Sequence, residues 1–250
     1  MRLFLIGLMI LASTAVGATD LTKLNDQALA PVWQLNRTCS SSVIYSHRDQ
    51  KTGKVETLIL TAKHCIEGAE GTGHTVYQQA YQANRLVSEV AYKAKVKAKD
   101  YASDLALLVL VDEQTLIEKT VKLAAGDLAY IQGEDAVAVG YSKGLSRTAT
   151  AGMLGPMESV PFPVAGKDSE YLRASPQIAG GNSGGALFHI NAAGDYEQLA
   201  VATAVIPASD FMGYWTHFAE IDKFLRRVAP QMYPAAPAPG KVGSVASEGR

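Results

Sequence analysis

The decisive stretch of this 250-residue sequence is Gly180-Gly181-Asn182-Ser183-Gly184-Gly185-Ala186-Leu187. A serine lies among glycines, and an apolar run that favours a β-strand follows it directly. Glycines before the serine let the backbone turn sharply, so that N–H groups can point into a site. A serine hydroxyl becomes a useful nucleophile when a neighbouring base removes its proton. The segment therefore predicts a candidate nucleophile, Ser183, on a turn that leads into a strand.

Two earlier segments supply the partners that such a serine needs, namely Leu60-Thr61-Ala62-Lys63-His64-Cys65 and Ser103-Asp104-Leu105-Ala106-Leu107-Leu108. His64 Nε2 would take the serine proton, and Asp104 would accept a hydrogen bond from Nδ1–H and fix the tautomer. The amides of Gly181 and Ser183 are the candidate oxyanion hole. Each residue alone has a structural explanation, as a strand-end histidine, a strand-capping aspartate or a loop serine. Their joint occurrence, in this order, predicts a catalytic triad.

The rest of the sequence reads as many short strands separated by Gly, Asn, Asp and Ser, which favours an all-β barrel or sandwich. Tyr92–Lys99 alternates strictly between apolar residues and lysines, which is typical of a half-buried strand. Its lysines are expected to form a solvated face rather than an anion-binding site. The predicted strands are Ser42–Tyr45, Val55–Thr61, Val87–Ala98, Leu105–Val111, Ala136–Tyr141, Thr148–Leu154, Glu170–Ala174, Ala186–Ile190, Leu199–Ile206 and Gly213–Thr216.

Only one segment is predicted to be helical. Phe218, Ile221, Leu225 and Val228 recur at spacings of three and four, which places them on one helix face. Acidic residues precede basic ones along this stretch, as the helix dipole favours.

At its three segments the chain resembles the trypsin-like, or chymotrypsin-fold, serine peptidases. Thr61-Ala62-Lys63-His64-Cys65 is similar to the family's Thr-Ala-Ala-His-Cys, and Asp104-Leu-Ala-Leu-Leu to its Asp-Ile-Ala-Leu-Leu. Gly181-Asn182-Ser183-Gly184-Gly185 is similar to its Gly-Asp-Ser-Gly-Gly. Weaker similarities extend the resemblance over residues 32 to 229.

The resemblance implies two antiparallel six-stranded β-barrels followed by a C-terminal α-helix. It implies a first barrel over residues 19–118 with His64 and Asp104, and a second barrel with the helix over residues 119–232 with Ser183. The link between them is expected near Leu116–Leu123. The activity implied is that of a serine-type endopeptidase, a hydrolase that forms an acyl-enzyme intermediate.

The two cysteines, Cys39 and Cys65, form an even pair in a chain expected to be exported, which suggests a disulfide. Two buried free thiols are the alternative. The resemblance adds that the family has a bridge beside its catalytic histidine, and Cys39 and Cys65 match its positions.

Specificity is read from the resemblance alone. The family's pocket base, six residues before the serine, corresponds to Gln177, which carries no charge to select Arg or Lys. The substrate-lining strand corresponds to Ala204-Val205-Ile206, with Gly213 on the neighbouring strand; Ile206 is expected to narrow the entrance. We therefore expect a preference for small or medium neutral side chains. Ala204 lies near the place of a hydroxyl that often supports the aspartate, and Thr203 is the candidate to replace it.

One departure from the family pattern concerns activation. Asn182 stands where many members have an aspartate that pairs with a newly freed N-terminus, and asparagine has no charge to pair. An Arg-Ile-Val-Gly-Gly-like cleavage site is also missing before Trp33. We therefore expect activity without an activation cut. Bacterial quality-control proteases of this fold also use Gly-Asn-Ser-Gly-Gly, but we do not expect their peptide-binding domain in the residues that follow Ser183 here.

The chain ends and the composition indicate where the protein works. Residues 1–18 read as a signal peptide, with an apolar run too short to span a bilayer, and a retained anchor is the alternative. Residues 233–250 read as a disordered tail. A net charge of −1 gives no sign of a nucleic-acid or membrane partner. We expect a secreted or periplasmic protein whose partners are a peptide or protein substrate and, in addition, a protein inhibitor.

The remaining histidines do not cluster at metal-ligand spacing, so we expect no cofactor and no catalytic metal. Two rival functions stay open. One is a pseudoprotease that binds without cutting. The other is an α/β-hydrolase esterase, in which Asp195 or Asp210 with His217 would complete the triad. In that fold, however, the serine motif should open a helix, whereas Ser183 leads into a predicted strand.

Overall fold

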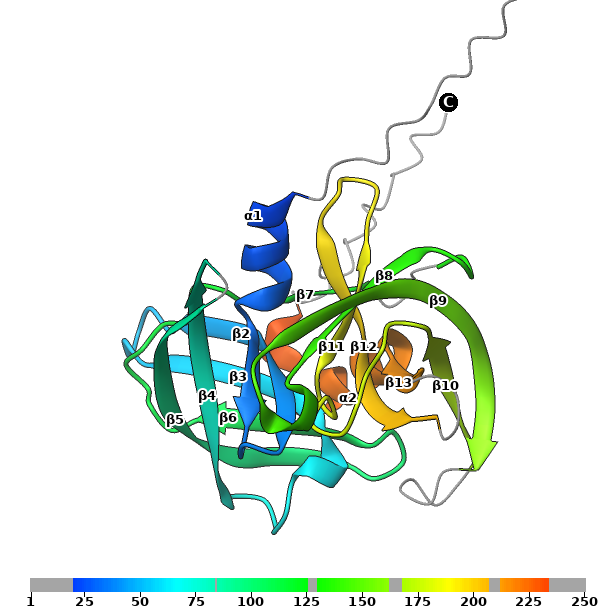
Figure 1. Cartoon of the computed structure of the whole chain (residues 1–250). Helices are drawn as coiled ribbons and strands as arrows, with labels where there is room; N and C mark the ends of the chain where they lie inside the picture. The colour runs from blue at the N-terminus through cyan, green and yellow to red at the C-terminus, as the bar shows by residue number, and fades with distance from the viewer. Residues whose placement is uncertain (1–19, 84, 126–129, 162–167, 207–211, 234–250) are drawn as a thin grey trace, which may run out of the picture.

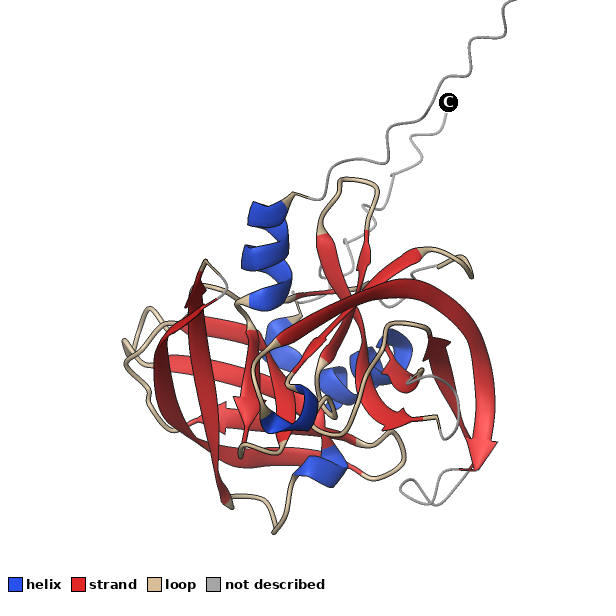
Figure 2. Cartoon of the chain, in the orientation of Figure 1, coloured by secondary structure: helices blue, strands red, loops and turns tan. Residues whose placement is uncertain are grey.

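A computed structural model describes residues 20–83, 85–125, 130–161, 168–206 and 212–233. Strands dominate it, with few helices (Figure 2). The predicted signal peptide and the predicted tail beyond Tyr233 lie outside the described residues. Within the part that is described, no helix is both long and apolar enough to cross a membrane.

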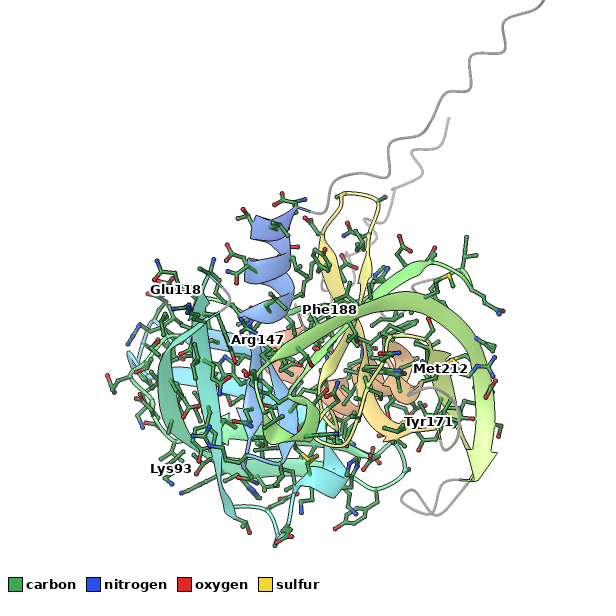
Figure 3. All side chains as sticks on the ribbon, in the orientation of Figure 1. Lys93, Glu118, Arg147, Tyr171, Phe188 and Met212 are labelled. Atoms are coloured by element: carbon green, nitrogen blue, oxygen red, sulfur yellow. A yellow bond between two sulfur atoms is a disulfide. The ribbon has the colours of Figure 1, made fainter. Side chains whose placement is uncertain are left out.

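The first half of the chain forms a closed antiparallel barrel, in the order β1-β2-β3-β6-β5-β4 (Figure 1). Its strands are β1 (Val32–Leu35), β2 (Cys39–Arg48), β3 (Val55–Ala62), β4 (Gly73–Gln82), β5 (Arg85–Asp100) and β6 (Leu105–Leu110). Closure leaves no free edge to pair with another chain. The lysines of β5 face outwards, as Lys93 shows in Figure 3, while Ala94 and Val96 are buried.

The second half forms another closed antiparallel ring, in the order β11-β8-β9-β10-β13-β12, with β12 pairing back to β11. Its strands are β8 (Asp135–Gly140), β9 (Thr148–Pro161), β10 (Asp168–Ala174), β11 (Ala186–Ile190), β12 (Tyr196–Val205) and β13 (Gly213–His217). The short β7 (Lys122–Leu123) adds to β12 in parallel. The predicted pair of six-stranded barrels is thus confirmed, and the expected division at residues 118 and 119 falls between β6 and β7.

The antiparallel fold overturns the α/β-hydrolase alternative, because Ser183 leads into β11 rather than a helix. His217 caps a helix by accepting a hydrogen bond from Ala219 N at 3.3 Å, and Asp195 pairs with Lys23 at 2.8 Å. Asp210 lies outside the described residues. Neither described residue is hydrogen-bonded to Ser183.

The predicted C-terminal helix is present as α2 (Phe218–Val228), and its apolar face is buried. The prediction of a single helix was wrong. A second one, α1 (Leu21–Lys23), continues into a wider π-helical segment over Leu24–Leu29 and lies beside the β11–β12 hairpin (Figure 1). Single 3₁₀ turns occur at Lys63–Cys65, Ser142–Gly144 and Pro230–Met232.

Three apolar clusters fill the molecule: one inside each barrel and one between the barrels. Strand β6 explains how they share residues. Leu108 and Leu110 point into the first barrel, whereas Leu105 and Leu107 face the cluster between the barrels, which also contains Phe188 (Figure 3). Both faces of β6 are buried, so its sequence is continuously apolar rather than alternating. The shared cluster fixes the barrels against each other, which a site built between them requires.

Candidate active site

Strand pairing brings His64 and Asp104 together. Strands β3 and β6 pair antiparallel with Ala62 opposite Leu105, so the end of β3 and the start of β6 lie at the same edge of the barrel. His64 follows β3 in a 3₁₀ turn, and Asp104 directly precedes β6. Lys63 N donates to Asp104 O at 2.8 Å, which ties the two turns together.

The carboxylate of Asp104 receives both of its hydrogen bonds from His64. Its Oδ2 accepts from His64 Nδ1 at 2.7 Å, and its Oδ1 accepts from the His64 backbone N–H at 2.9 Å. Asp104 is fully buried, whereas the His64 side chain is 28% exposed. Two N–H donors compensate the buried charge. An ionised carboxylate on Nδ1 places the proton there and leaves Nε2 free to accept a proton from another group.

The peptide before Asp104 is held by hydroxyls of the second barrel. Thr216 Oγ1 donates to Ser103 O at 2.7 Å and lies 2.9 Å from Thr203 Oγ1. Because the Thr216 proton points to Ser103, Thr203 is the donor of the second bond. Asp104 itself has φ +55°, a left-handed conformation that is unusual for a residue with a side chain. Thr203 thus acts on the backbone beside Asp104, not on its carboxylate.

Ser183 lies in the loop between β10 and β11, against the first barrel. Its carbonyl accepts a hydrogen bond from Ser40 N at 2.8 Å and lies 3.6 Å from Cys65 Sγ, next to His64. Gly184 has φ +80°, and a Cβ at this position would collide with Thr61 and Ser40. Only glycine lets the loop come so close to the end of β3.

The loop Gly180–Ser183, called the oxyanion loop after the role predicted for its N–H groups, is anchored by its carbonyls. Gly180 O accepts from Lys143 N at 2.5 Å, and Asn182 O accepts from Gly185 N at 2.7 Å. In a trans peptide the C=O and N–H point in opposite directions, so these two bonds orient the N–H groups of Gly181 and Ser183 away from their anchors. Among the described residues neither N–H has an acceptor. Gly181 needs φ +95°, and a Cβ there would collide with Tyr141 O.

The side chains of Ser183 and His64 are not in hydrogen-bond contact in this structure. Within the described part of the chain, no hydrogen bond links Ser183 Oγ to His64 Nε2. Ser183 is partly exposed, so its hydroxyl has room to rotate. Catalytic hydrogen bonds are often long in a free enzyme and tighten when substrate binds.

Near the predicted specificity pocket, two neighbouring residues of the β10–β11 loop differ in burial. Gln177 is exposed, and only its carbonyl is engaged, by Thr150 Oγ1 at 2.8 Å. The buried neighbour Ile178 packs against Gly213, where a Cβ would also lie 3.0 Å from Trp215 Nε1. Counting back from the serine missed Ile178, whose apolar side chain between Gln and Ala was the available signal.

The segment Ala204–Ile206, which is predicted to line the substrate, is less buried than Ile178. Ala204 and Val205 end β12, opposite Tyr214 and Gly213, and are half-buried. Ile206 follows and donates its N–H to Met212 O at 2.8 Å. These residues are therefore partly exposed where they lie next to Gly213.

Asn182 is held in the second barrel by a hydrogen bond between two neutral side chains. Its side chain is buried, and Oδ1 accepts from Ser142 Oγ at 2.7 Å.

The predicted Cys39–Cys65 disulfide is present, with Cα atoms 6.2 Å apart. No group of three or more His, Cys, Asp or Glu side chains that could hold a metal ion occurs in the described ranges.

Comparisons with known proteins agree with this architecture. The sequence matches the family described as "Trypsin-like peptidase domain" over residues 40–195. It is 32% identical over 151 residues to a probable periplasmic serine protease do/HhoA-like of Haemophilus influenzae, covering 60% of this chain and 29% of that protein. It is 28% identical over 171 residues to the periplasmic serine endoprotease DegP of Salmonella typhimurium, covering 67% and 34%. The chain thus spans about a third of the length of these curated relatives.

Solved structures show the same fold. A serine endoprotease from Yersinia pestis superposes with a TM-score of 0.61 at 21% identity, covering 86% of this chain and 68% of that one. The Rv3671c protease from M. tuberculosis, in its active form, has a TM-score of 0.59 at 17% identity, with coverages of 88% and 87%. At such identities the likeness establishes the fold.

Proposed function

The chain belongs to the trypsin-like peptidase family, and from that premise we propose that it is a serine endopeptidase with His64, Asp104 and Ser183 as its triad. The observation that carries the proposal is a pair of features on facing barrels. A buried carboxylate is bonded to His64 Nδ1 at 2.7 Å, and the oxyanion loop opposite presents two N–H groups that have no acceptor among the described residues.

The proposed reaction has two halves. His64 Nε2 takes the Ser183 proton while Oγ bonds to the substrate carbonyl carbon, and the carbonyl oxygen becomes negatively charged between Gly181 N–H and Ser183 N–H. The C–N bond then breaks, the amine leaves with the proton from His64, and an acyl-enzyme remains. Water then attacks the acyl carbon while His64 takes one of its protons; the bond from that carbon to Ser183 Oγ breaks, Oγ regains the proton from His64, and the acid is released. Asp104 stabilises the imidazolium throughout.

A Ser183→Ala variant tests the assignment. We expect hydrolysis of casein to fall by about 10⁴-fold or more, because the nucleophile is lost. Labelling of the protein by a fluorophosphonate should also disappear. The His64→Ala variant should likewise resist labelling, because the base that activates Ser183 is missing. Wild-type labelling at a different serine, located by peptide mass spectrometry, would contradict the assignment.

The absence of a bond between Ser183 and His64 favours one second candidate, a catalytically weak or inactive binding module. The same assays separate the two functions. A pseudoprotease would bind casein without cleaving it, and its Ser183 would resist the fluorophosphonate.

For specificity we propose a pocket for small or medium neutral side chains. Ile178, Gly213 and Trp215 pack closely where the pocket wall is expected, and none carries a charge. Exposed Gln177 is replaced in this role by Ile178. Cleavage sites from a peptide library should show a neutral residue before the scissile bond; dominant cleavage after Arg or Lys would refute this.

We further propose activation without an N-terminal cut, in a secreted or periplasmic setting. The neutral Ser142–Asn182 pair supports the first part, since it holds the serine loop without a charged N-terminus. The periplasmic relatives and the apolar start of the chain support the second. Protein beginning near Thr19 should be active as purified; protein that stays inert until nicked before β1 would disprove the idea.

A further inference from the structure

Ser40 is a first-barrel residue that reaches into the second barrel. It follows Cys39 in β2 and is fully buried. Its hydroxyl donates to Gly181 O at 2.8 Å and accepts from Tyr141 N at 2.8 Å. Its backbone N–H donates to Ser183 O, also at 2.8 Å. One side chain and one amide of Ser40 therefore hold two carbonyls of the oxyanion loop.

These two bonds complete a set. The four carbonyls of Gly180–Ser183 are all held: two by Ser40, one by Gly185 N and one by Lys143 N. Because the Gly181–Asn182 peptide lies between the two N–H groups of the oxyanion hole, its rotation would reorient both. Two bonds oppose this rotation: the Ser40 hydroxyl donates to Gly181 O at 2.8 Å, and Asn182 N donates to Ala179 O at 3.1 Å.

The Ser40 hydroxyl also supports the turn whose Lys143 N–H holds Gly180 O. Lys143, which holds Gly180 O, lies two residues after Tyr141 in a turn with φ +56°. Tyr141 N is fixed by Ser40 Oγ, so the hydroxyl secures the start of this turn. Loss of the hydroxyl would leave two backbone groups unpaired, the buried Tyr141 N–H and the partly buried Gly181 C=O.

The neighbouring serines make no such connection. Ser41 Oγ donates to Trp33 O at 3.2 Å within the first barrel, and Ser42 Oγ is buried without a hydrogen-bond partner. All three hydroxyls are buried on one strand, so burial alone does not explain the role of Ser40.

We propose that Ser40 is a positioning residue. Its hydroxyl keeps the oxyanion loop in the conformation in which the N–H groups of Gly181 and Ser183 can bind a negatively charged oxygen. This inference rests on the proposed peptidase function. If it holds, the geometry of the oxyanion hole in the second barrel depends on a side chain of the first barrel as well as on the loop around Ser183.

The test compares Ser40→Ala with the matched control Ser41→Ala in the full chain. Fluorophosphonate inactivation is measured over a range of probe concentrations, which separates the maximal rate from the half-saturating concentration. We expect Ser40→Ala to lower the maximal rate by about 10- to 100-fold, because misplaced donors stabilise the transition state poorly, with little change in half-saturation. Ser41→Ala should stay within about 3-fold of wild type. A wild-type rate in Ser40→Ala, or an equal loss in Ser41→Ala, would overturn the proposal.

Amide hydrogen exchange provides a readout that does not need activity, and its wild-type measurement does not depend on whether a variant folds. The Tyr141 N–H should be protected in the wild-type protein and should exchange at least about 10-fold faster in Ser40→Ala but not in Ser41→Ala. Free exchange of Tyr141 in the wild type would overturn the positioning role. Wild-type protein that is never labelled at Ser183, yet protects Tyr141, would instead refute the peptidase function and leave the contact intact.

Discussion

At the scale of single residues, Thr216 joins the second barrel to the loop of Asp104. Its hydroxyl is buried and donates to Ser103 O, one peptide before the carboxylate that orients His64. Thr216→Val has nearly the same shape and removes this donor. We expect a loss of about 1–3 kcal/mol in the free energy of unfolding, because a buried carbonyl loses its partner. We also expect slower fluorophosphonate labelling of Ser183.

Thr203→Val is the matched comparison, since it leaves the bond from Thr216 to Ser103 in place. Urea unfolding of both single variants and the double variant measures their coupling. Labelling that slows equally in both variants would show that the Ser103 bond has no special role in placing Asp104.

Residue identity in the candidate triad was readable from the sequence, but the residues that support it were not. Short motifs carry His64, Asp104 and Ser183 because their chemistry demands particular side chains at particular turns. Ser40 carries no such signal, since its acceptor Gly181 is 141 positions away in the chain. Gln177 was predicted by counting back from the serine; it is exposed, whereas its neighbour Ile178 is buried. Sequence position does not reveal which of two adjacent side chains in an irregular loop faces the interior.

At the scale of elements, the start of α2 is expected to respond to pH. Burial lowers the pKa of His217 from its ordinary value of 6.5, and Glu220 and Glu170 oppose the shift. His217 Nδ1 caps the helix as an acceptor, which a protonated ring cannot do. A folded-state pKa below the unfolded one means that this stability is complete above about pH 6.5 and is lost as the pH falls through the folded-state pKa.

His217→Asn keeps a capping acceptor that does not titrate. Urea unfolding at about pH 7.5 and about pH 5 should show a larger loss of stability in the wild type than in His217→Asn, with a limiting slope of about 1.4 kcal/mol per pH unit. Equal losses in the two proteins would show that His217 does not titrate between these values.

Which elements could be predicted depended on how each one is stabilised. The alternation in β5 and the spacing in α2 record burial on one face, and both predictions are confirmed. Strand β1 was missed because all four of its residues are buried, so no alternation exists. The helix over Leu21–Leu29 was missed because its stability comes from distant contacts, such as Gln27 Oε1 accepting from Tyr196 N at 2.9 Å.

At the scale of the whole molecule, the Cys39–Cys65 disulfide links the strand of Ser40 to the turn of His64. It closes a loop with a sequence separation of 26, for which the chain-entropy model gives about 3.5 kcal/mol of stability. A Cys39→Ala, Cys65→Ala double variant should lose stability of this order in urea unfolding.

Since the bridge lies between Ser40 and His64, the double variant should also label more slowly at Ser183. Wild-type protein treated with dithiothreitol and checked for free thiols is the matched comparison. Unchanged stability and unchanged labelling in both samples would show that the bridge is dispensable.

Gly184 fits against Thr61 and Ser40 only because it lacks a side chain, and this close fit has a consequence for biosynthesis. A growing polypeptide that has left the ribosome as far as the first barrel holds a base and a carboxylate but nothing to activate. Under the proposed function, proteolytic activity would require the second barrel to fold and pack against the first. We therefore expect a ribosome-stalled fragment ending at residue 170 to show no casein hydrolysis, so that synthesis of the proposed peptidase would not expose neighbouring nascent chains to proteolysis.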